Sequence, residues 1–486
     1  MNNNLKKSNI VSALMWKLME RGGTQFIQFV IQIILARLLL PEDFGIIALV
    51  IILINIANVF VQSGFNTALI QKKKVDELDY SSVFYLSLFI AFLLYIMIFF
   101  FASLIARFYQ ESILLPVLRV LSLTMFLGVF NSIQNAIIAR NMEFRKLFFS
   151  STIAILLSGS VGIYMAYTGF GVWALVIQQL SNQLIVTLSL FFKVKWRPQI
   201  IFSIGRVKSL FSFGWKLLVA VLIDTIYREL RSLIIGKFYN PAMLGFYNRG
   251  QQFPSVIVSN IDGSIQSVML PVLSSQQDNR VRIKDMMRRA IVTSSFVIFP
   301  MMVGLAVTAE PLVKIILTDK WLPAVPFLQI FCAVYALMPI HTSNLQAINA
   351  LGRSDIYLKL EMIKKTLGFI ILAFTVFYGV YAIAFGLVFA GLIGSFINAY
   401  PNKKLLDYSY KEQLIDIMPS LLLSLIMGVV VYCFKWLGMS VLNTLITQIF
   451  VGFVMYVGMA WMFKLECFNY LLLTCESILA DLKGIK

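Results

Sequence analysis

Residues 35–45 read LARLLLPEDFG, and residues 235–245 read IGKFYNPAMLG. The two stretches align at a single offset, so that Arg37, Pro41 and Gly45 correspond to Lys237, Pro241 and Gly245. Weaker matches occur in the same order along the chain: 16–17 with 215–216, 63–64 with 262–263, 115–118 with 325–328, and 171–174 with 379–382. Matches in the same order at offsets of about 200 to 210 residues indicate a duplicated chain with a unit of about 200 residues.

The composition places most of the chain in lipid. Of the 486 residues, 59% are hydrophobic and only 13% are charged, whereas soluble domains average about 45–50% apolar and about 25% charged residues. A membrane-spanning helix needs about 20 mostly apolar residues, and about fourteen such segments occur here. Their centres are expected near Phe26, Leu53, Phe92, Phe126, Leu157, Leu180, Val221, Ser259, Val303, Val334, Phe369, Gly391, Met427 and Val454.

The repeat and the span count together define the expected fold. Each repeat holds about six spans, so the two halves have the same orientation, as in parallel-repeat transporters with a substrate site between the lobes. We therefore expect an all-α integral membrane protein with about 14 transmembrane helices. Its expected parts are an N-terminal six-helix lobe (1–195), a C-terminal six-helix lobe (196–405), two additional transmembrane helices (406–466) and a cytoplasmic tail (467–486).

The net charge of +18 reflects topology rather than nucleic-acid binding. Lysine and arginine gather in alternate loops and near both termini, and the intervening loops, such as 41–43, are short and poor in basic residues. This positive-inside pattern predicts that both ends of the chain are cytoplasmic. The first apolar run follows Lys6 and Lys7 and lacks a small-residue cleavage site, so no removable signal peptide is expected.

Metal and thiol chemistry are not expected. The four cysteines have no metal-ligand spacing, and we expect free, buried thiols: Cys332, Cys433, Cys467 and Cys475. His341 is the only histidine, and a structural or pore-lining role is favoured over catalysis. No catalytic residue, metal site or cofactor is predicted.

Ionisable side chains inside spans are costly and usually face a cavity or a partner. They gather in the first helix of each predicted lobe. In the first, Lys17, Arg21, Gln25, Gln28 and Gln32 are three or four residues apart and share a face; in the second, Lys216, Asp224, Tyr227 and Arg231 form a similar stripe with Arg228 beside it. The alternative is a purely structural role, in which these side chains extend to the membrane–water interface or pair with one another.

The functional interpretation is a water-filled, net-positive cleft that binds an anion. Arginine and lysine hold phosphate oxygens well, and the expected cations are Lys17, Arg21, Lys216, Arg228 and Arg231. Polar lining is expected from Gln25, Gln28, Gln32 and Tyr227. The carboxylates that are candidates for carrying a coupling ion are Glu20, Asp224, Glu229 and Asp262, with charge compensation of nearby cations as the alternative for each.

The two proline–glycine segments carry a family resemblance. With Tyr247-Asn248-Arg249-Gly250 and residues 271–274, they resemble the Wzx-type polysaccharide flippases, in particular the branch of colanic acid and teichuronic acid exporters. That branch belongs to the multidrug/oligosaccharidyl-lipid/polysaccharide exporter superfamily. The resemblance implies alternating-access flipping of an oligosaccharide linked to undecaprenyl pyrophosphate in the bacterial cytoplasmic membrane. It also implies membrane lipids and the polysaccharide polymerase and export machinery as partners.

Three other functions share some of these features. An ion-coupled multidrug antiporter of the same superfamily has the same fold but favours an acidic cavity, and a peptidoglycan-precursor flippase shares both fold and cationic cavity. A membrane polymerase or ligase is expected to place catalytic residues in a large outer loop, and every predicted outer loop is short. The chain has no Gly-x4-Gly-Lys-Ser/Thr motif, so ion exchange is favoured over ATP as the energy source.

Overall fold

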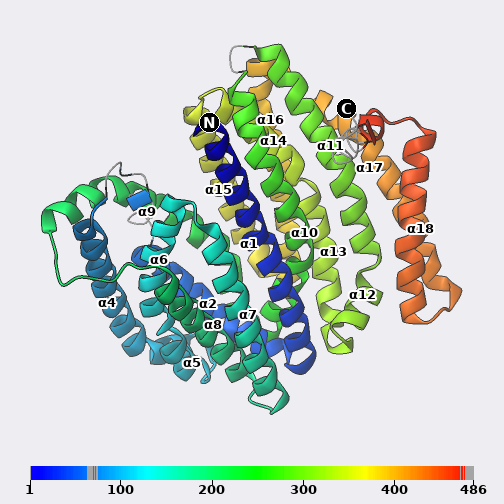
Figure 1. The fold of residues 1–486 in the computed structure, drawn as a ribbon. Coiled ribbons are helices and arrows are strands. Elements are labelled where there is room, and N and C mark those ends of the chain that lie inside the picture. Colours follow the sequence, from blue (N-terminus) through cyan, green and yellow to red (C-terminus); the bar gives the residue numbers. More distant parts are fainter. Residues whose placement is uncertain are drawn as a thin grey trace. The chain divides into compact units, whose positions relative to one another are not determined.

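The computed structural model describes residues 2–62, 69–70, 72, 75–276, 279–470, 472–473 and 476, and these residues form helices joined by short connections, with no strand among them (Figure 1). The helices are α1 (Asn2–Leu38), α2 (Pro41–Gln62), α4 (Glu77–Tyr109), α5 (Leu114–Leu121), α6 (Thr124–Asn141), α7 (Phe144–Tyr167), α8 (Val172–Lys193), α9 (Ile204–Phe238), α10 (Pro241–Ser274), α11 (Arg280–Val307), α12 (Ala309–Ile316), η1 (Asp319–Ala324), α13 (Val325–Ala336), α14 (Met338–Ala350), α15 (Ser354–Thr375), η2 (Val376–Tyr378), α16 (Val380–Leu406), α17 (Tyr410–Cys433), η3 (Phe434–Leu437) and α18 (Val441–Met462).

Most of the long helices have the length and composition of membrane spans. Eleven described segments pass that test, and the number rises to 12 if α9, which bends by 55° between Ile204–Ser212 and Gly214–Phe238, is taken as one span. Every predicted span centre lies within a helix. Helices α1 and α15 are not among the eleven, because glutamines in α1 and charged residues in α15 interrupt their apolar runs. The all-helical membrane fold is confirmed, and the count of about fourteen spans stays a prediction.

The chain divides into two compact units, Met1–Gly245 and Phe246–Lys486, with the boundary inside α10. In the first unit, α1 packs on α7, α7 on α8, and α8 on α6, while α9 packs against α2 and α4 (Figure 1). These units are defined by compactness, whereas the predicted lobes (1–195 and 196–405) are defined by the sequence repeat. The division into compact units therefore does not test the lobes, which stay a prediction.

The repeated prolines open two helices in the same way. Pro41 and Pro241 are the first residues of α2 and α10, the position at which the missing N–H of proline costs no helical hydrogen bond. Just before α2, the Leu40 N–H donates to Asp43 Oδ2 at 2.9 Å. At α10, the Met243 N–H donates to Asn240 Oδ1 at 2.7 Å. The first turn of each helix is therefore stabilised by a proline and a nearby polar side chain of the same segment.

Three basic loops of the first unit meet at one end of its bundle. Lys72 pairs with the buried Asp79 at 2.6 Å, and Arg206 pairs with Asp76 at 3.1 Å. Arg140, at the end of α6, donates to the carbonyl oxygens of Leu69, Ile70 and Lys72. Asp76 caps α4, because its Oδ1 accepts a hydrogen bond from the Asp79 N–H at 2.9 Å. This bond, followed by Arg206 and Lys72, holds the pKa of the Asp76 carboxyl below its usual value. That these loops lie on the cytoplasmic face stays a prediction.

In the second unit, the additional helices α17 and α18 pack on α11. Phe296 of α11 joins Met427 and Tyr456 in one apolar cluster, and the Tyr456 hydroxyl donates to the Phe296 carbonyl oxygen at 2.8 Å. Cys467, the first residue of the predicted tail, is buried in the same cluster. Beyond it, residues 471, 474–475 and 477–486 lie outside the described residues.

A buried amide network joins α14, α16 and α17. Asn344 donates to Gln413 Oε1 at 2.7 Å and accepts at Oδ1 from Asn402 at 2.7 Å. His341 Nδ1 lies 3.0 Å from Asn398 Nδ2 in the same region. Hydrogen-bonded polar groups of this kind fix how helices pack within a membrane protein.

The predicted thiols are free at the three cysteines that the structure describes. Cys332 and Cys467 are buried, as expected, but Cys433 is exposed. It is the last residue of α17, where the helix ends and fewer neighbours cover the side chain. Cys475 lies outside the described residues.

Candidate substrate site in the N-terminal unit

A polar cavity of about 440 Å³ lies within the helix bundle of the first unit. Helices α1, α2, α6, α7 and α8 all contribute to its wall. The lining residues are Lys17, Glu20, Gln62, Ile70, Asn131, Asn135, Ile138, Ala139, Phe144, Leu147, Ser151, Gln183 and Val186. Polar walls among membrane-spanning helices usually mark a path or site for a polar solute.

Two of the predicted site residues, Lys17 and Glu20, lie together at this cavity. Lys17 Nζ and Glu20 Oε2 are 2.9 Å apart, and the ammonium group also lies 5.3 Å from the centre of the Phe144 ring. The Lys17 side chain is 47% exposed and that of Glu20 is 18% exposed. Lysine and carboxylate therefore neutralise each other in this structure, and the other polar residues of the lining that the structure describes are uncharged.

The uncharged lining comes from amides one helical turn apart. Asn131 and Asn135 of α6 share a face, as do Gln179 and Gln183 of α8. Gln183 also lines a second cavity, of about 180 Å³. That cavity is lined by Ile51, Ile54, Asn55, Asn58, Leu121, Thr124, Gln179 and Gln183. None of these four amides is among the site residues predicted from the sequence, although their four-residue spacing was the available signal.

Two amide oxygens of the residues that line this cavity are buried without a hydrogen-bond partner in the described part of the chain. They are the Oδ1 atoms of Asn131 and Asn135. The Gln62 side chain contacts Asn58 Oδ1 at 3.5 Å, a long and weak hydrogen bond. Buried acceptors without partners are uncommon in proteins and call for a water or a ligand hydroxyl.

The predicted stripe on α9 lies in the same unit, where α9 packs against α2. Arg231 is buried, with its guanidinium 5.1 Å from the centre of the Tyr227 ring and a 3.4 Å contact to the Tyr227 hydroxyl. Arg228 pairs with Asp224 at 3.1 Å on an exposed face. Glu229 is close enough to Asn55 to interact with it electrostatically, and Asn55 lines the smaller cavity.

The other predicted residues are more dispersed. Arg21, Gln28 and Lys216 are exposed, whereas Gln25 and Gln32 are half-buried. None of the cations Arg21, Lys216, Arg228 and Arg231 lines either amide-walled cavity. Asp262 belongs to the second unit, where it is buried; its Oδ2 accepts from Gln266 at 2.7 Å, and its Oδ1 has no partner in the described part of the chain.

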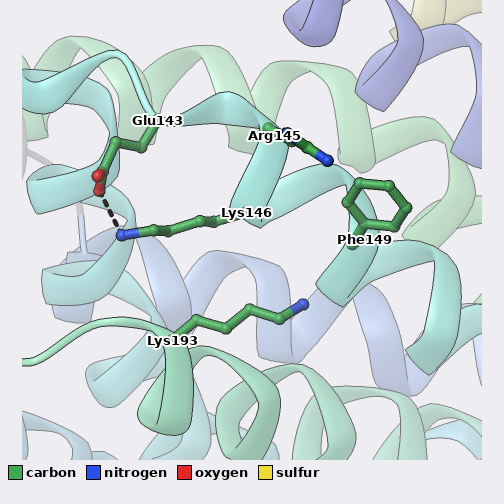
Figure 2. Close-up of a pocket in the computed structure, with 5 residues that line it drawn as sticks. All are labelled: Glu143, Arg145, Lys146, Phe149 and Lys193. Atoms are coloured by element: carbon green, nitrogen blue, oxygen red, sulfur yellow. Dashed lines mark hydrogen bonds and ion pairs between the residues drawn. The ribbon is translucent and has the colours of Figure 1, made fainter.

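A separate basic pocket of about 410 Å³ lies where α7 begins and α8 ends. Its walls are Glu143, Arg145, Lys146, Phe149 and Lys193, drawn in Figure 2. Lys146 reaches toward Glu143, with 2.9 Å between their charged atoms. The positive-inside pattern predicts cations in these loops but does not predict that they surround a pocket.

The apolar helices and the polar cavities among them define a multi-pass α-helical membrane protein. A family model described as "Polysaccharide biosynthesis protein" matches residues 34–326. The chain belongs to this family, as the sequence resemblance predicted, and the protein is a multi-pass protein of the bacterial inner membrane.

Curated relatives carry related names. The chain is 25% identical over 313 residues to the succinoglycan biosynthesis transport protein ExoT of Rhizobium meliloti, covering 64% of this chain and 63% of that protein. It is 24% identical over 305 residues to the teichuronic acid biosynthesis protein TuaB of Bacillus subtilis, covering 62% of each. It is 22% identical over 411 residues to the lipopolysaccharide biosynthesis protein WzxC of Escherichia coli, covering 82% of this chain and 83% of that protein. The match thus spans under two thirds of the first two relatives' length.

Solved structures share the fold. The lipid II flippase MurJ in an inward closed conformation superposes with a TM-score of 0.75 at 17% identity, over 93% of this chain and 98% of that one. An inward-facing multidrug resistance MATE family transporter of the MOP superfamily superposes with a TM-score of 0.60 at 16% identity, over 79% and 94%. The chain therefore shares the fold of these two structures.

Proposed function

We propose that the protein flips an oligosaccharide linked to undecaprenyl pyrophosphate across the cytoplasmic membrane for polysaccharide export. Two relatives are named as biosynthesis proteins for surface polysaccharides, one as a transport protein in such a pathway, and a protein of the same fold is a lipid II flippase. These names describe transport and biosynthesis, so the function proposed is that of a transporter and not of an enzyme.

The observation that carries the proposal is the amide-lined cavity of the first unit. Sugar hydroxyls both donate and accept hydrogen bonds, and an amide side chain offers both partners. A wall with Asn131, Asn135 and Gln183 suits a neutral, hydroxyl-rich headgroup better than a cationic drug, which would require unpaired carboxylates. Glu20 is the carboxylate at this wall, and Lys17 already pairs with it.

The finer features of the transport cycle belong to the same proposal. About fourteen spans in two parallel lobes, with both ends cytoplasmic, would rock about a central site. Lys17, Arg21, Lys216, Arg228 and Arg231 would supply positive charge along the path of the pyrophosphate. The polysaccharide polymerase and export machinery would receive the flipped product.

Asp262 is the strongest of the candidates for ion coupling. Its carboxylate is buried, and one oxygen has no partner in the described part of the chain. A buried carboxylate with one unfilled acceptor oxygen offers a coupling ion a partner that a fully satisfied carboxylate does not. By contrast, Glu20 pairs with Lys17 and Asp224 pairs with Arg228.

A peptidoglycan-precursor flippase is the second candidate, favoured by the TM-score of 0.75 against MurJ. Both candidates move a polyprenyl-linked headgroup, so the test must compare substrates. Purified protein in proteoliposomes would be given fluorescent lipid II or the oligosaccharide-lipid that accumulates in a deletion strain. Flipping of the oligosaccharide-lipid alone supports the proposal.

The experiment in the host uses the same deletion strain. Loss of the gene should leave undecaprenyl-pyrophosphate oligosaccharide in the inner leaflet, and restoring the gene should relieve the accumulation. An unchanged leaflet distribution in a host with no second exporter, together with drug efflux by the protein, would replace the flippase with a multidrug antiporter.

A further inference from the structure

The basic pocket at the start of α7 has the composition of a phosphate site. Arg145, Lys146 and Lys193 surround it, and Glu143 is the one carboxylate among the described residues of its wall, so these four side chains carry a net charge of +2. Lys146 is partly neutralised by Glu143, whereas the charged ends of Arg145 and Lys193 lie on the side of Phe149 (Figure 2). Arginine and lysine together hold phosphate oxygens with strong, charge-assisted hydrogen bonds.

Neighbouring side chains hold the two cations in place. Lys193 Nζ donates to Ser150 Oγ at 3.0 Å. The Arg145 guanidinium lies 5.4 Å from the centre of the Trp16 ring and 5.8 Å from that of Phe149. A cation that is already positioned loses less side-chain entropy when it binds a ligand.

An apolar surface adjoins this pocket. From Phe149, exposed apolar side chains follow one face of α7 at helical spacing, through Ile153 and Leu156. Next to Lys193, Phe192 of α8 is 79% exposed. Because α7 and α8 pack side by side, the pocket lies at the charged end of a lipid-facing surface. A ligand with a phosphate group and a long hydrocarbon chain matches both parts.

We propose that this pocket binds the diphosphate group of a polyprenyl-linked substrate on the cytoplasmic side, before the headgroup enters the helix bundle. The assignment rests on the proposed flippase function. A diphosphate diester carries about two negative charges, which complements the cations of the pocket. Phe144, Leu147 and Ser151 of the same first turns of α7 line the amide cavity. Opposite faces of one helix start would thus bear the diphosphate site and the sugar site.

The positive-inside rule explains on which membrane side these cations lie, but not why they surround a cavity. Lys195 and Lys208 provide the comparison: both are exposed, both lie in the predicted cytoplasmic basic region, and neither lines the pocket. Neutralising them changes the net charge of that face equally and leaves the pocket intact.

The test measures binding of undecaprenyl diphosphate to the full-length protein in nanodiscs of zwitterionic lipid. The double variant Arg145→Gln/Lys193→Gln should bind about tenfold or more weakly than the wild type, since two charge-assisted contacts are lost. The double variant Lys195→Gln/Lys208→Gln should bind as the wild type does. Arg145→Lys/Lys193→Arg keeps both charges and should recover most of the affinity. Thermal unfolding of each variant verifies that it is folded.

Several outcomes would overturn the assignment. Equal binding by the pocket and control variants would show that the cations serve topology alone. Inorganic pyrophosphate that binds as tightly as the lipid would indicate a free-phosphate site, and displacement of the ligand by an equal concentration of cardiolipin would indicate an anionic phospholipid site. If the wild type flips the substrate and the pocket variant binds it normally, the pocket assignment is wrong and the flippase function is retained. If the wild type binds undecaprenyl diphosphate but flips no substrate, the flippase function is wrong and the binding site is retained.

Discussion

A Cβ atom added to Gly45 would clash with the carbonyl oxygen of Pro241. The relationship is reciprocal, because a Cβ on Gly245 would clash with the carbonyl oxygen of Pro41. These four residues occupy the matching positions of the two proline–glycine motifs, so each motif contacts the other through the same atoms. The duplication of the whole chain stays a prediction.

Replacing Gly45 by alanine should destabilise the protein. The new methyl group cannot fit against the Pro241 carbonyl without moving a helix start, and such overpacking typically costs about 1–3 kcal/mol. Thermal unfolding in detergent should show a lower Tm for Gly45→Ala and for Gly245→Ala. Gly458→Ala is the control, since nothing lies within 4 Å of its added Cβ. Equal Tm values for Gly45→Ala and Gly458→Ala would contradict the close contact.

Replacing Gln183 by leucine should impair transport while the protein stays folded. Gln183 lines both amide cavities, and leucine offers no hydrogen bond to a sugar hydroxyl at similar volume. One lost hydrogen bond to a bound ligand corresponds to about a 3–10-fold reduction in the initial flipping rate. Gln329→Leu is a matched control, because that glutamine is exposed on α13 in the second unit. A Gln183→Leu rate equal to the control would remove this residue from the substrate path.

Removing the predicted cations should stop export without preventing membrane insertion. Arg231 is buried beside Tyr227, so Arg231→Ala loses both a charge and packing, whereas Arg231→Lys keeps the charge. Lys216→Ala loses a charge at an exposed site. We expect at least about a tenfold drop in flipping for both alanine variants and partial recovery with Arg231→Lys. Full export by both alanine variants, at normal protein levels, would exclude these residues from the site.

Tyr408 should make stability sensitive to alkaline pH. Burial, followed by the hydrogen bond that its hydroxyl donates to Asp416 Oδ2 at 2.6 Å, raises the pKa of Tyr408 above its ordinary value. Because the pKa of Tyr408 is raised in the folded state, its contribution to the free energy of unfolding is fully present below about pH 10, the pKa of a tyrosine in the unfolded chain. This stabilisation is lost as the pH rises further.

The measurement is the Tm of the wild type and of Tyr408→Phe between pH 8 and 11. Below about pH 10 the variant should be less stable by about 0.5–1.5 kcal/mol, the usual net value of one hydrogen bond. Toward pH 11 the two Tm values should converge. A constant difference across the whole range would show that Tyr408 does not titrate with folding.

Local sequence features predicted much of this fold. Apolar runs of sufficient length gave the helices, and Pro41 and Pro241 open α2 and α10 as their position in the motif suggests. The pairing of Lys17 with Glu20 also followed from a spacing of three residues on one helix. Such features depend on residues that are close along the chain, and a single sequence contains them in full.

Functional cavities were harder to predict because their walls come from separate helices. Gln62, Asn131 and Gln183 were each unremarkable polar residues in apolar runs, and only the packing of α2, α6 and α8 brings them to one cavity. The same holds for Lys193, which reaches the start of α7 from the far end of α8. Sequence reasoning instead favoured Arg21 and Lys216, which are exposed, because charge stands out in an apolar helix regardless of what it faces.

The sequence by itself therefore determined the membrane class, the helices, the repeated motif and the family of this protein. Hydrophobicity and helix-start chemistry are local, and a duplicated motif can be read along one chain. Tertiary structure decided which polar residues share a cavity and which cations surround a pocket. It also brought Gly45 against Pro241. Those relations depend on the rotation and depth at which each helix packs, and these are set by side-chain contacts between segments far apart in sequence.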